Sequence, residues 1–226
     1  MSNSQRSAAT YLSLATVLVI YPGFRMAVGY LDLFPAQDGR TAWWSLWAVI
    51  LVGHLICAAV VLAAIASETG GLASVGIDIA VFVRRRYIFL LILLVACLIG
   101  YLAPSYLYGG DLPEQMRSHP LGPVTAAQRV FWVVMAVTAG FVEELAYRGY
   151  AITRLRGLLG LPIAVIASIV AFALMHGPSA FIPQFSMLYL VSGALFATAF
   201  LWMRLRRLEV LIITHTAIDL LLVAAP

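Results

Sequence analysis

Long apolar stretches alternate with short polar segments along most of the chain. Seven of these stretches reach or approach the roughly 20 residues that a helix needs to cross the hydrocarbon core of a bilayer. They cover residues 9–31, 42–66, 87–108, 128–156, 161–177, 182–203 and 208–225. The pattern therefore predicts an all-α, polytopic transmembrane helical bundle, and we expect residues 1–226 to form a single integral membrane domain.

Two segments depart from this simple pattern. In the first apolar stretch, Pro22 and Gly23 are followed by Arg25, which predicts a break or kink and an arginine that reaches the membrane interface. Residues 71–86 end in three consecutive arginines, so we expect them to form a short interfacial segment and not a span.

The composition is that of a membrane protein. Hydrophobic residues make up 63% of the chain and charged residues 11%, with a mean hydropathy of +0.98, whereas soluble domains carry about 25% charged residues. A lipid bilayer is therefore the expected surrounding. The net charge of +4 comes without a basic stretch interleaved with aromatic residues, so no nucleic acid is expected as a partner. Cys57 and Cys97 lie in different apolar stretches and are interpreted as small core residues.

The arginines indicate how the helices are oriented, because cytoplasmic loops are enriched in arginine and lysine. If the N-terminus is cytoplasmic, most arginines fall on the cytoplasmic side: Arg6, Arg84, Arg85, Arg86, Arg154, Arg156, Arg204, Arg206 and Arg207. The sequence therefore predicts a multi-pass protein of the cell membrane with a cytoplasmic N-terminus.

Two adjacent carboxylates interrupt the fourth apolar stretch. Glu143 and Glu144 are followed one turn later by Arg148, although each formal charge at the bilayer centre costs roughly 2.5 to 3.5 kcal/mol on insertion scales. Neighbours on a helix diverge by about 100°, so the two glutamates cannot have the same role. We expect Glu144 to pair with Arg148 at the i, i+4 spacing and to support the site, and Glu143 to face a cavity.

Three further polar side chains lie in the C-terminal stretches, namely His176, His215 and Asp219. A turn at residues 157–162 makes a helical hairpin in which Glu143 and His176 both lie about 16 residues, or roughly 24 Å, from the turn. The next turn, at residues 204–209, places Asp219 at a similar level, and the i, i+4 spacing puts His215 on the same helix face. These ionisable groups are therefore expected to meet at one level of the bundle.

Three motifs resemble those of a known family, the CPBP intramembrane proteases, which include the type II CAAX prenyl endopeptidases and bacterial bacteriocin-processing relatives. They follow in order: Glu-Glu-x-x-x-Arg at Glu143, Glu144 and Arg148, Phe-x-x-x-His at Phe172 and His176, and His-x-x-x-Asn/Asp at His215 and Asp219. The resemblance covers residues 124–226, the expected catalytic core spans, while residues 1–123 match only as accessory spans. Family members usually have eight helices, which implies a bundle of about seven to eight and places a missed helix in residues 71–86 or 177–186.

The resemblance implies an endopeptidase that hydrolyses a peptide bond within the membrane by means of a glutamate-activated water. Glu143 would be the general base, and His176 would hold and polarise the water. His215 would stabilise the oxyanion of the tetrahedral intermediate. Asp219 stands where many members carry asparagine and cannot donate a hydrogen bond unless it is protonated, so its expected task is to hold His215. The expected substrate is a membrane-associated peptide or protein.

Other interpretations stay open. No cofactor is the leading expectation, but Glu143, His176, His215 and Asp219 also form a plausible set of zinc ligands, and zinc would activate water as well. Intramembrane carboxylates and histidines also serve proton-coupled transporters. A non-catalytic immunity or scaffold protein is a further alternative with the same fold. His54, in the second stretch, belongs to none of the motifs and is interpreted as a packed, hydrogen-bonded histidine.

Overall fold

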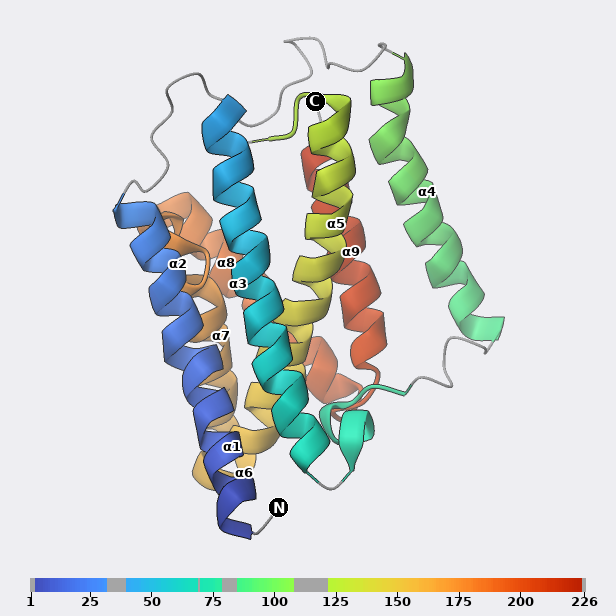
Figure 1. The fold of residues 1–226 in the computed structure, drawn as a ribbon. Coiled ribbons are helices and arrows are strands. Elements are labelled where there is room, and N and C mark those ends of the chain that lie inside the picture. The colour runs from blue at the N-terminus through green and yellow to red at the C-terminus, as the bar shows by residue number, and fades with distance from the viewer. Residues whose placement is uncertain (1–2, 32–39, 69, 79–84, 108–121, 225–226) are drawn as a thin grey trace. The chain divides into compact units, whose positions relative to one another are not determined.

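The computed structural model describes residues 3–31, 40–68, 70–78, 85–107 and 122–224 (Figure 1). Within these ranges every regular element is helical, which confirms an all-α membrane bundle. Among the described residues, four helical segments are long and apolar enough to cross a membrane: Ala8–Tyr30, Trp43–Ser67, Ala126–Leu159 and Pro183–Trp202. Two shorter apolar helices coincide with further expected stretches: Ile92–Ala103 and Leu161–Leu174.

The described residues group into two compact units. The first comprises Met1–Asp78 and Val142–Glu209, and the second comprises Ile79–Phe141 and Val210–Pro226. Each unit is discontinuous in sequence, so both cut across the expected division at residues 123 and 124. That division stays a prediction.

The first span is one continuous helical rod in spite of Pro22 (Figure 1). It consists of α1 (Asn3–Ala15), a π-helical segment η1 (Thr16–Ile20) and α2 (Tyr21–Tyr30). Of the expected break or kink at Pro22 and Gly23, the break is therefore wrong, and the kink stays a prediction. The π-helical segment ends at Ile20, two residues before the proline. Its wider turn accommodates the missing N–H and the bulk of the pyrrolidine ring without ending the helix.

The first unit contains seven further described elements: α3 (Arg40–Ser67), the 3-10 turn η2 (Gly71–Val75), the π-helical segment η5 (Glu144–Ile152), α6 (Thr153–Leu159), α7 (Leu161–Leu174), the 3-10 turn η6 (Gly177–Phe181) and α8 (Pro183–Trp202). Gly160, between α6 and α7, has a φ of 83°, which glycine adopts without strain, and it confirms the turn at residues 157–162. Of the two places expected for an extra helix, residues 177–186 hold only η6 and the start of α8. Residues 79–84 of the other place lie outside the described residues.

The second unit is built from α4 (Arg85–Leu107), most of α5 (Ala126–Glu143) and most of α9 (Leu208–Ala224). One side chain from each helix meets in its core: Tyr101, Ala136 and Leu220. Further apolar residues of α4 and α5 pack around them. Burial of this apolar surface holds the three helices together.

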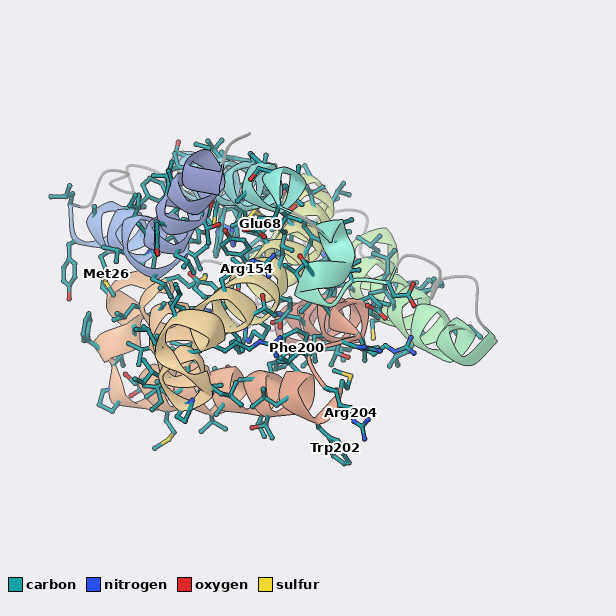
Figure 2. All side chains as sticks on the ribbon, turned by 90° about the horizontal axis from the view of Figure 1, so that it is seen from below. Met26, Glu68, Arg154, Phe200, Trp202 and Arg204 are labelled. Carbon is teal, nitrogen blue, oxygen red and sulfur yellow. The ribbon has the colours of Figure 1, made fainter. Side chains whose placement is uncertain are left out.

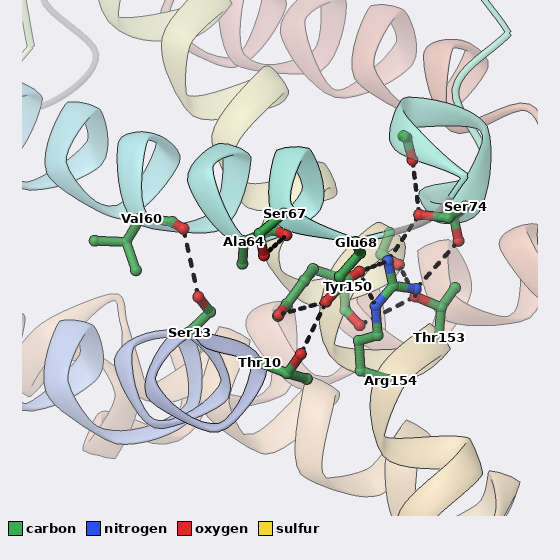
Figure 3. Close-up of polar contacts among 12 residues, drawn as sticks. Thr10, Ser13, Val60, Ala64, Ser67, Glu68, Ser74, Tyr150, Thr153 and Arg154 are labelled. Atoms are coloured by element: carbon green, nitrogen blue, oxygen red, sulfur yellow. Dashed lines mark hydrogen bonds and ion pairs between the residues drawn. The ribbon is translucent and has the colours of Figure 1, made fainter. Parts of the chain in front are cut away.

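A polar cluster ties α1, the end of α3, η2, η5 and α6 of the first unit together (Figure 3). Glu68, just after α3, accepts hydrogen bonds from Arg154 Nε at 2.8 Å and from Thr10 Oγ1 at 3.0 Å. Tyr150 OH donates to the same carboxylate at 3.3 Å, and Arg154 Nη2 donates to Ser74 Oγ at 2.7 Å. Glu68 and Arg154 lie side by side in Figure 2 as well. Arg154, expected as a charge that sets orientation, is thus a partly buried partner of Glu68.

The connection after α8 turns sharply, as expected for residues 204–209. Arg204, Leu205 and Arg207 have positive φ values of 57°, 57° and 70°, a conformation that is uncommon for residues with a side chain. Trp202 is 87% exposed, and it points away from the helices together with Arg204 (Figure 2). An exposed tryptophan next to arginine is typical of a helix end at the membrane–water interface.

Candidate active site

The charged motif lies where α5 continues into η5. All nine residues of η5 are buried, and Glu143, the last residue before it, is 4% exposed. π-helical turns are rare and frequently occur at functional sites. The motif thus combines three charged side chains with an unusual backbone in the interior of the first unit.

Glu144 and Arg148 form the expected ion pair, in which Arg148 Nη1 donates to Glu144 Oε1 at 3.0 Å. Both side chains are buried, at 0% and 1% exposure. The guanidinium carbon lies 4.1 Å from the centre of the Phe172 ring on α7, and Nη2 donates to the carbonyl oxygen of Gly193 on α8 at 3.4 Å. Arg148 therefore neutralises Glu144 and also joins η5 to two neighbouring helices.

Glu143 faces a histidine of α3. The Nε2 atom of His54 lies 3.2 Å from Glu143 Oε1, and His54 is only 2% exposed. The ring of His54 therefore covers this oxygen, and the expectation that Glu143 faces a cavity stays a prediction. The expectation of a hydrogen-bonded His54 is confirmed, but its partner is the carboxylate that the motif singles out.

Close packing of α2 against α3 positions His54. A Cβ atom at Gly53 would lie 2.7 Å from Phe24 Cε1 and 3.2 Å from Tyr21 Cε2. The ring of Tyr21 lies 5.5 Å from the ring of His54 between centroids. On the other side, His54 Nδ1 is 3.2 Å from the carbonyl oxygen of Ile50, one turn earlier in α3. The imidazole thus has a contact at both nitrogens and lies beside the ring of Tyr21.

His176 lies just beyond the end of α7, where its ring is also held on several sides. Its Nδ1 is 2.9 Å from the carbonyl oxygen of Phe172. The ring stacks on Tyr189 of α8 with centroids 3.8 Å apart and meets the Phe172 ring edge-on at 5.0 Å. The hydroxyl of Tyr189 is in turn 3.2 Å from Ser179 Oγ. Because a carbonyl oxygen only accepts, this contact favours the tautomer that carries its proton on Nδ1.

The segment that carries His176 is anchored to α2. Arg25 Nε donates to the carbonyl oxygen of Met175 at 2.9 Å, so the half-buried Arg25 binds within the protein. Its position at a membrane interface stays a prediction. Gly177 has a φ of 74°, and a Cβ there would lie 3.1 Å from the carbonyl oxygen of Arg25. A Cβ at Gly29 would collide with the ring of Pro178. These contacts require glycine at two positions and fix the end of α7.

The hairpin register agrees with the predicted level of the motif. Ser168 Oγ donates to the carbonyl oxygen of Tyr147 at 2.7 Å, and the rings of Tyr147 and Phe172 are 5.8 Å apart in an edge-on arrangement. Tyr147 lies one turn from Glu143, and Phe172 lies one turn from His176. Because Tyr147 contacts Phe172, Glu143 and His176 lie at neighbouring levels on adjoining helices.

His215 and Asp219 belong to α9 in the second unit. His215 Nε2 lies 3.7 Å from Asp219 Oδ2, which confirms that the i, i+4 spacing places both on one face. Near them, a Cβ at Gly140 of α5 would lie 3.0 Å from the backbone nitrogen of Thr216. The backbones of α5 and α9 are therefore in close contact beside His215. The roles of His215 and Asp219 in the site stay predictions.

A zinc centre is built from three or four protein ligands. In the described part of the chain, no group of three His, Cys, Asp or Glu side chains is placed to hold a metal ion. Glu143 and His54 supply two donors. The zinc alternative for Glu143, His176, His215 and Asp219 stays open to a direct chemical test.

Motif reading alone missed three residues beside the site. His54 and Tyr21 lie in the N-terminal spans that resemble the family only as generic helices, and Tyr189 is one aromatic residue among many in α8. A histidine in an otherwise apolar span was the single signal available for His54. For the two tyrosines the sequence carried no distinguishing signal.

Helical spans around buried carboxylates and histidines define a polytopic membrane protein with an intramembrane polar site. Residues 125–221 match the family model described as Type II CAAX prenyl endopeptidase Rce1-like. Over these residues the chain is similar to the CAAX-type proteases, as its motifs predict. The family is one of membrane-embedded peptidases, which supports integral membrane localisation and peptidase activity. No curated protein and no solved structure matches the chain.

Proposed function

We propose that this protein is an intramembrane endopeptidase in which a water molecule activated by Glu143 hydrolyses a peptide bond. The observation that carries the proposal is the environment of Glu143. It is a buried carboxylate held by a histidine at 3.2 Å, next to a second carboxylate that Arg148 already neutralises. The match of residues 125–221 to a peptidase family supports the same reaction.

In the proposed reaction, Glu143 removes one proton from water while the water oxygen forms a bond to the peptide carbonyl carbon. The carbonyl electrons move onto its oxygen and give a tetrahedral oxyanion. Glu143 then returns the proton to the amide nitrogen, the C–N bond breaks, and a free amine leaves. The other product is a carboxylic acid. General base catalysis of this kind contributes about 10² to 10⁴-fold to the rate.

His176 is proposed to hold the water. Its Nδ1–H is engaged by the Phe172 carbonyl oxygen at 2.9 Å, so its neutral Nε2 can accept a hydrogen bond from water. His215, paired with Asp219 at 3.7 Å, is proposed to donate to the oxyanion, because a preorganised donor at that position lowers the barrier most. Both assignments follow the order of the family motifs.

The proposed substrate is a membrane-associated peptide or protein, and the proposed location is the cell membrane with a cytoplasmic N-terminus. The arginine bias supports this orientation. The exposed Trp202 at the α8 end supports an interface at the side that would be cytoplasmic.

The test compares the peptide termini in membranes of cells that produce the native protein or the Glu143→Gln variant. New protein ends are expected only with the native protein, because glutamine cannot take a proton from water. Glu209→Gln is the matched control, since Glu209 is also buried but lies at the start of α9 away from the motif. Undiminished cleavage by a correctly folded Glu143→Gln variant rules out the proposed mechanism.

A further inference from the structure

His176 stands outside the regular part of α7, so its position depends on contacts with other segments. The helix ends at Leu174, and beyond a helix end the regular hydrogen bonds between residues four apart stop. The backbone N–H of His176 donates instead to the carbonyl oxygen of Ala173, three residues earlier, at 3.1 Å. Helical geometry alone therefore does not fix the ring that the proposed reaction needs in one place.

Tyr189 of α8 covers one face of the His176 ring. The two ring centroids are 3.8 Å apart and the ring planes differ by 18°, so the rings are stacked nearly parallel. Phe172 meets the same imidazole edge-on, with centroids 5.0 Å apart and an angle of 72° between the planes. At such separations the rings are in van der Waals contact. The imidazole therefore cannot turn about its Cβ–Cγ bond without moving Tyr189 or Phe172.

The hydroxyl of Tyr189 reaches the backbone of the same histidine through Ser179. The hydroxyl of Ser179 donates to the carbonyl oxygen of His176 at 2.9 Å. Its Oγ atom lies 3.2 Å from the hydroxyl oxygen of Tyr189. A serine hydroxyl has only one hydrogen to donate, so Ser179 accepts from Tyr189 and the tyrosine is the donor. One chain of hydrogen bonds thus runs from Tyr189 through Ser179 to the His176 backbone.

We propose that Tyr189 is a positioning residue of the peptidase site, which fixes the ring of His176 by stacking and its backbone through Ser179. The inference rests on the proposed function, because it assigns a task to Tyr189 through a residue of that reaction. A single side chain of α8 then acts on both the imidazole and the carbonyl group of His176. Support of this kind holds a catalytic group within about 0.5 Å of its productive geometry.

Tyr189 is itself held by the packing of α8 against α7. Its ring stacks on Phe185, one turn earlier in α8, with centroids 6.4 Å apart and an angle of 18°. One turn later in α8, a Cβ at Gly193 would lie 3.2 Å from Phe172 Cδ1. The missing side chain of Gly193 thus lets α8 lie close to α7, the helix that ends beside His176.

The consequence for the reaction is that Tyr189 affects kcat only through His176. In the proposed reaction His176 holds the attacking water, and a displacement of about 1 Å in such a group can cost about 10²-fold in rate. Tyr189 exchanges no proton and makes no bond to the substrate. Its ring and its hydroxyl should therefore contribute separately, the ring to the imidazole and the hydroxyl to the backbone.

The first experiment measures kcat and KM of Tyr189→Leu and Tyr189→Phe in phospholipid nanodiscs, using a peptide identified from the membrane comparison. Tyr189→Leu is expected to lower kcat by about 10²-fold with KM nearly unchanged, because leucine fills space without offering a flat face to the imidazole. Tyr189→Phe keeps the ring and loses one neutral hydrogen bond, so its kcat is expected within about tenfold of the native value. A leucine variant with native kcat, or a phenylalanine variant no better than leucine, overturns the proposal.

The second experiment observes the His176 ring independently of activity. The ring current of a stacked tyrosine shifts the proton resonances of the imidazole above it upfield. The chain has four histidines, so the ring protons of labelled histidine are assigned by comparison with a His176→Gln sample. The upfield shift is expected in the native protein and in Tyr189→Phe, and its loss is expected in Tyr189→Leu. A His176 signal that stays unchanged in Tyr189→Leu overturns the stacked arrangement and the proposal with it.

Tyr11→Leu is the matched control, because it is the same substitution at an exposed tyrosine of α1. It is expected to leave kcat unchanged. If Glu143→Gln retains full activity, the proposed function itself fails. If Glu143→Gln is inactive while Tyr189→Leu is fully active, only the role of Tyr189 fails.

Discussion

Arg25 of α2 donates a hydrogen bond from Nε to the carbonyl oxygen of Met175, the residue directly before His176, at 2.9 Å. The two residues are 150 positions apart in sequence. Their contact makes an N-terminal helix responsible for the end of α7. It gives the first span a part in the site although no family motif falls within it.

Replacing Arg25 with alanine is expected to lower both stability and kcat. The lost charge-assisted hydrogen bond corresponds to about 1.5 to 3 kcal/mol, and the freed end of α7 no longer holds the ring of His176. Unfolding in mixed micelles and steady-state kinetics measure the two effects. Arg156→Ala is the control, because Arg156 is exposed on α6. An Arg25→Ala variant as active and stable as that control contradicts the anchoring role.

Removing one member of the Glu144–Arg148 pair is expected to be more damaging than removing both. Arg148→Leu leaves Glu144 buried without its counter-charge, which costs about 3 to 5 kcal/mol. The double variant Glu144→Leu with Arg148→Leu replaces two charges by apolar groups and should recover part of this loss. Equilibrium unfolding of Arg148→Leu, Glu144→Leu and the double variant gives the coupling free energy between the two side chains. Strictly additive losses contradict a direct interaction.

The cluster around Glu68 and Arg154 is expected to support stability and not the chemistry. Glu68→Ala removes hydrogen bonds from Arg154, Thr10 and Tyr150, so a loss of about 2 kcal/mol is expected for this partly buried group. The kcat of the folded fraction should stay within about twofold of the native value. A selective loss of kcat at unchanged stability contradicts this assignment and links the cluster to catalysis.

Metal chelation separates the two ways of activating water. Glu143 needs no metal to act as a base, so activity of the purified protein is expected to survive exhaustive treatment with a zinc chelator. The measurement is the initial rate before and after treatment, followed by addition of zinc. Activity that disappears and returns only with zinc supports the zinc alternative for Glu143, His176, His215 and Asp219.

Local patterns predicted the helices well because span length and turn chemistry act over a few residues. The turn at Gly160 and the pair of Glu144 and Arg148 both follow from spacings that hold on any α-helix. The break expected at Pro22 does not occur, and the reason is not local. Proline perturbs the backbone near it, but whether the chain breaks or widens into a π turn depends on the packing that the neighbouring helices offer.

The partners of the charged residues could not be read from the pattern. His54 and Glu143 are separated by 89 positions, and nothing in either segment encodes the rotation or the relative depth of the helices that carry them. The same holds for Arg25 and Arg154, whose partners Met175 and Glu68 could not be predicted from the sequence.

By itself the sequence determined that the chain is a helical membrane protein with the motifs of a CAAX-type protease, because hydropathy and residue spacing are properties of the chain alone. Only the tertiary structure decided that Glu143 faces His54 and that α2 holds the segment of His176. Those contacts arise from close approach of helices at Gly53 and Gly29, where a side chain would collide with its neighbours. Such packing depends on shape complementarity between distant segments.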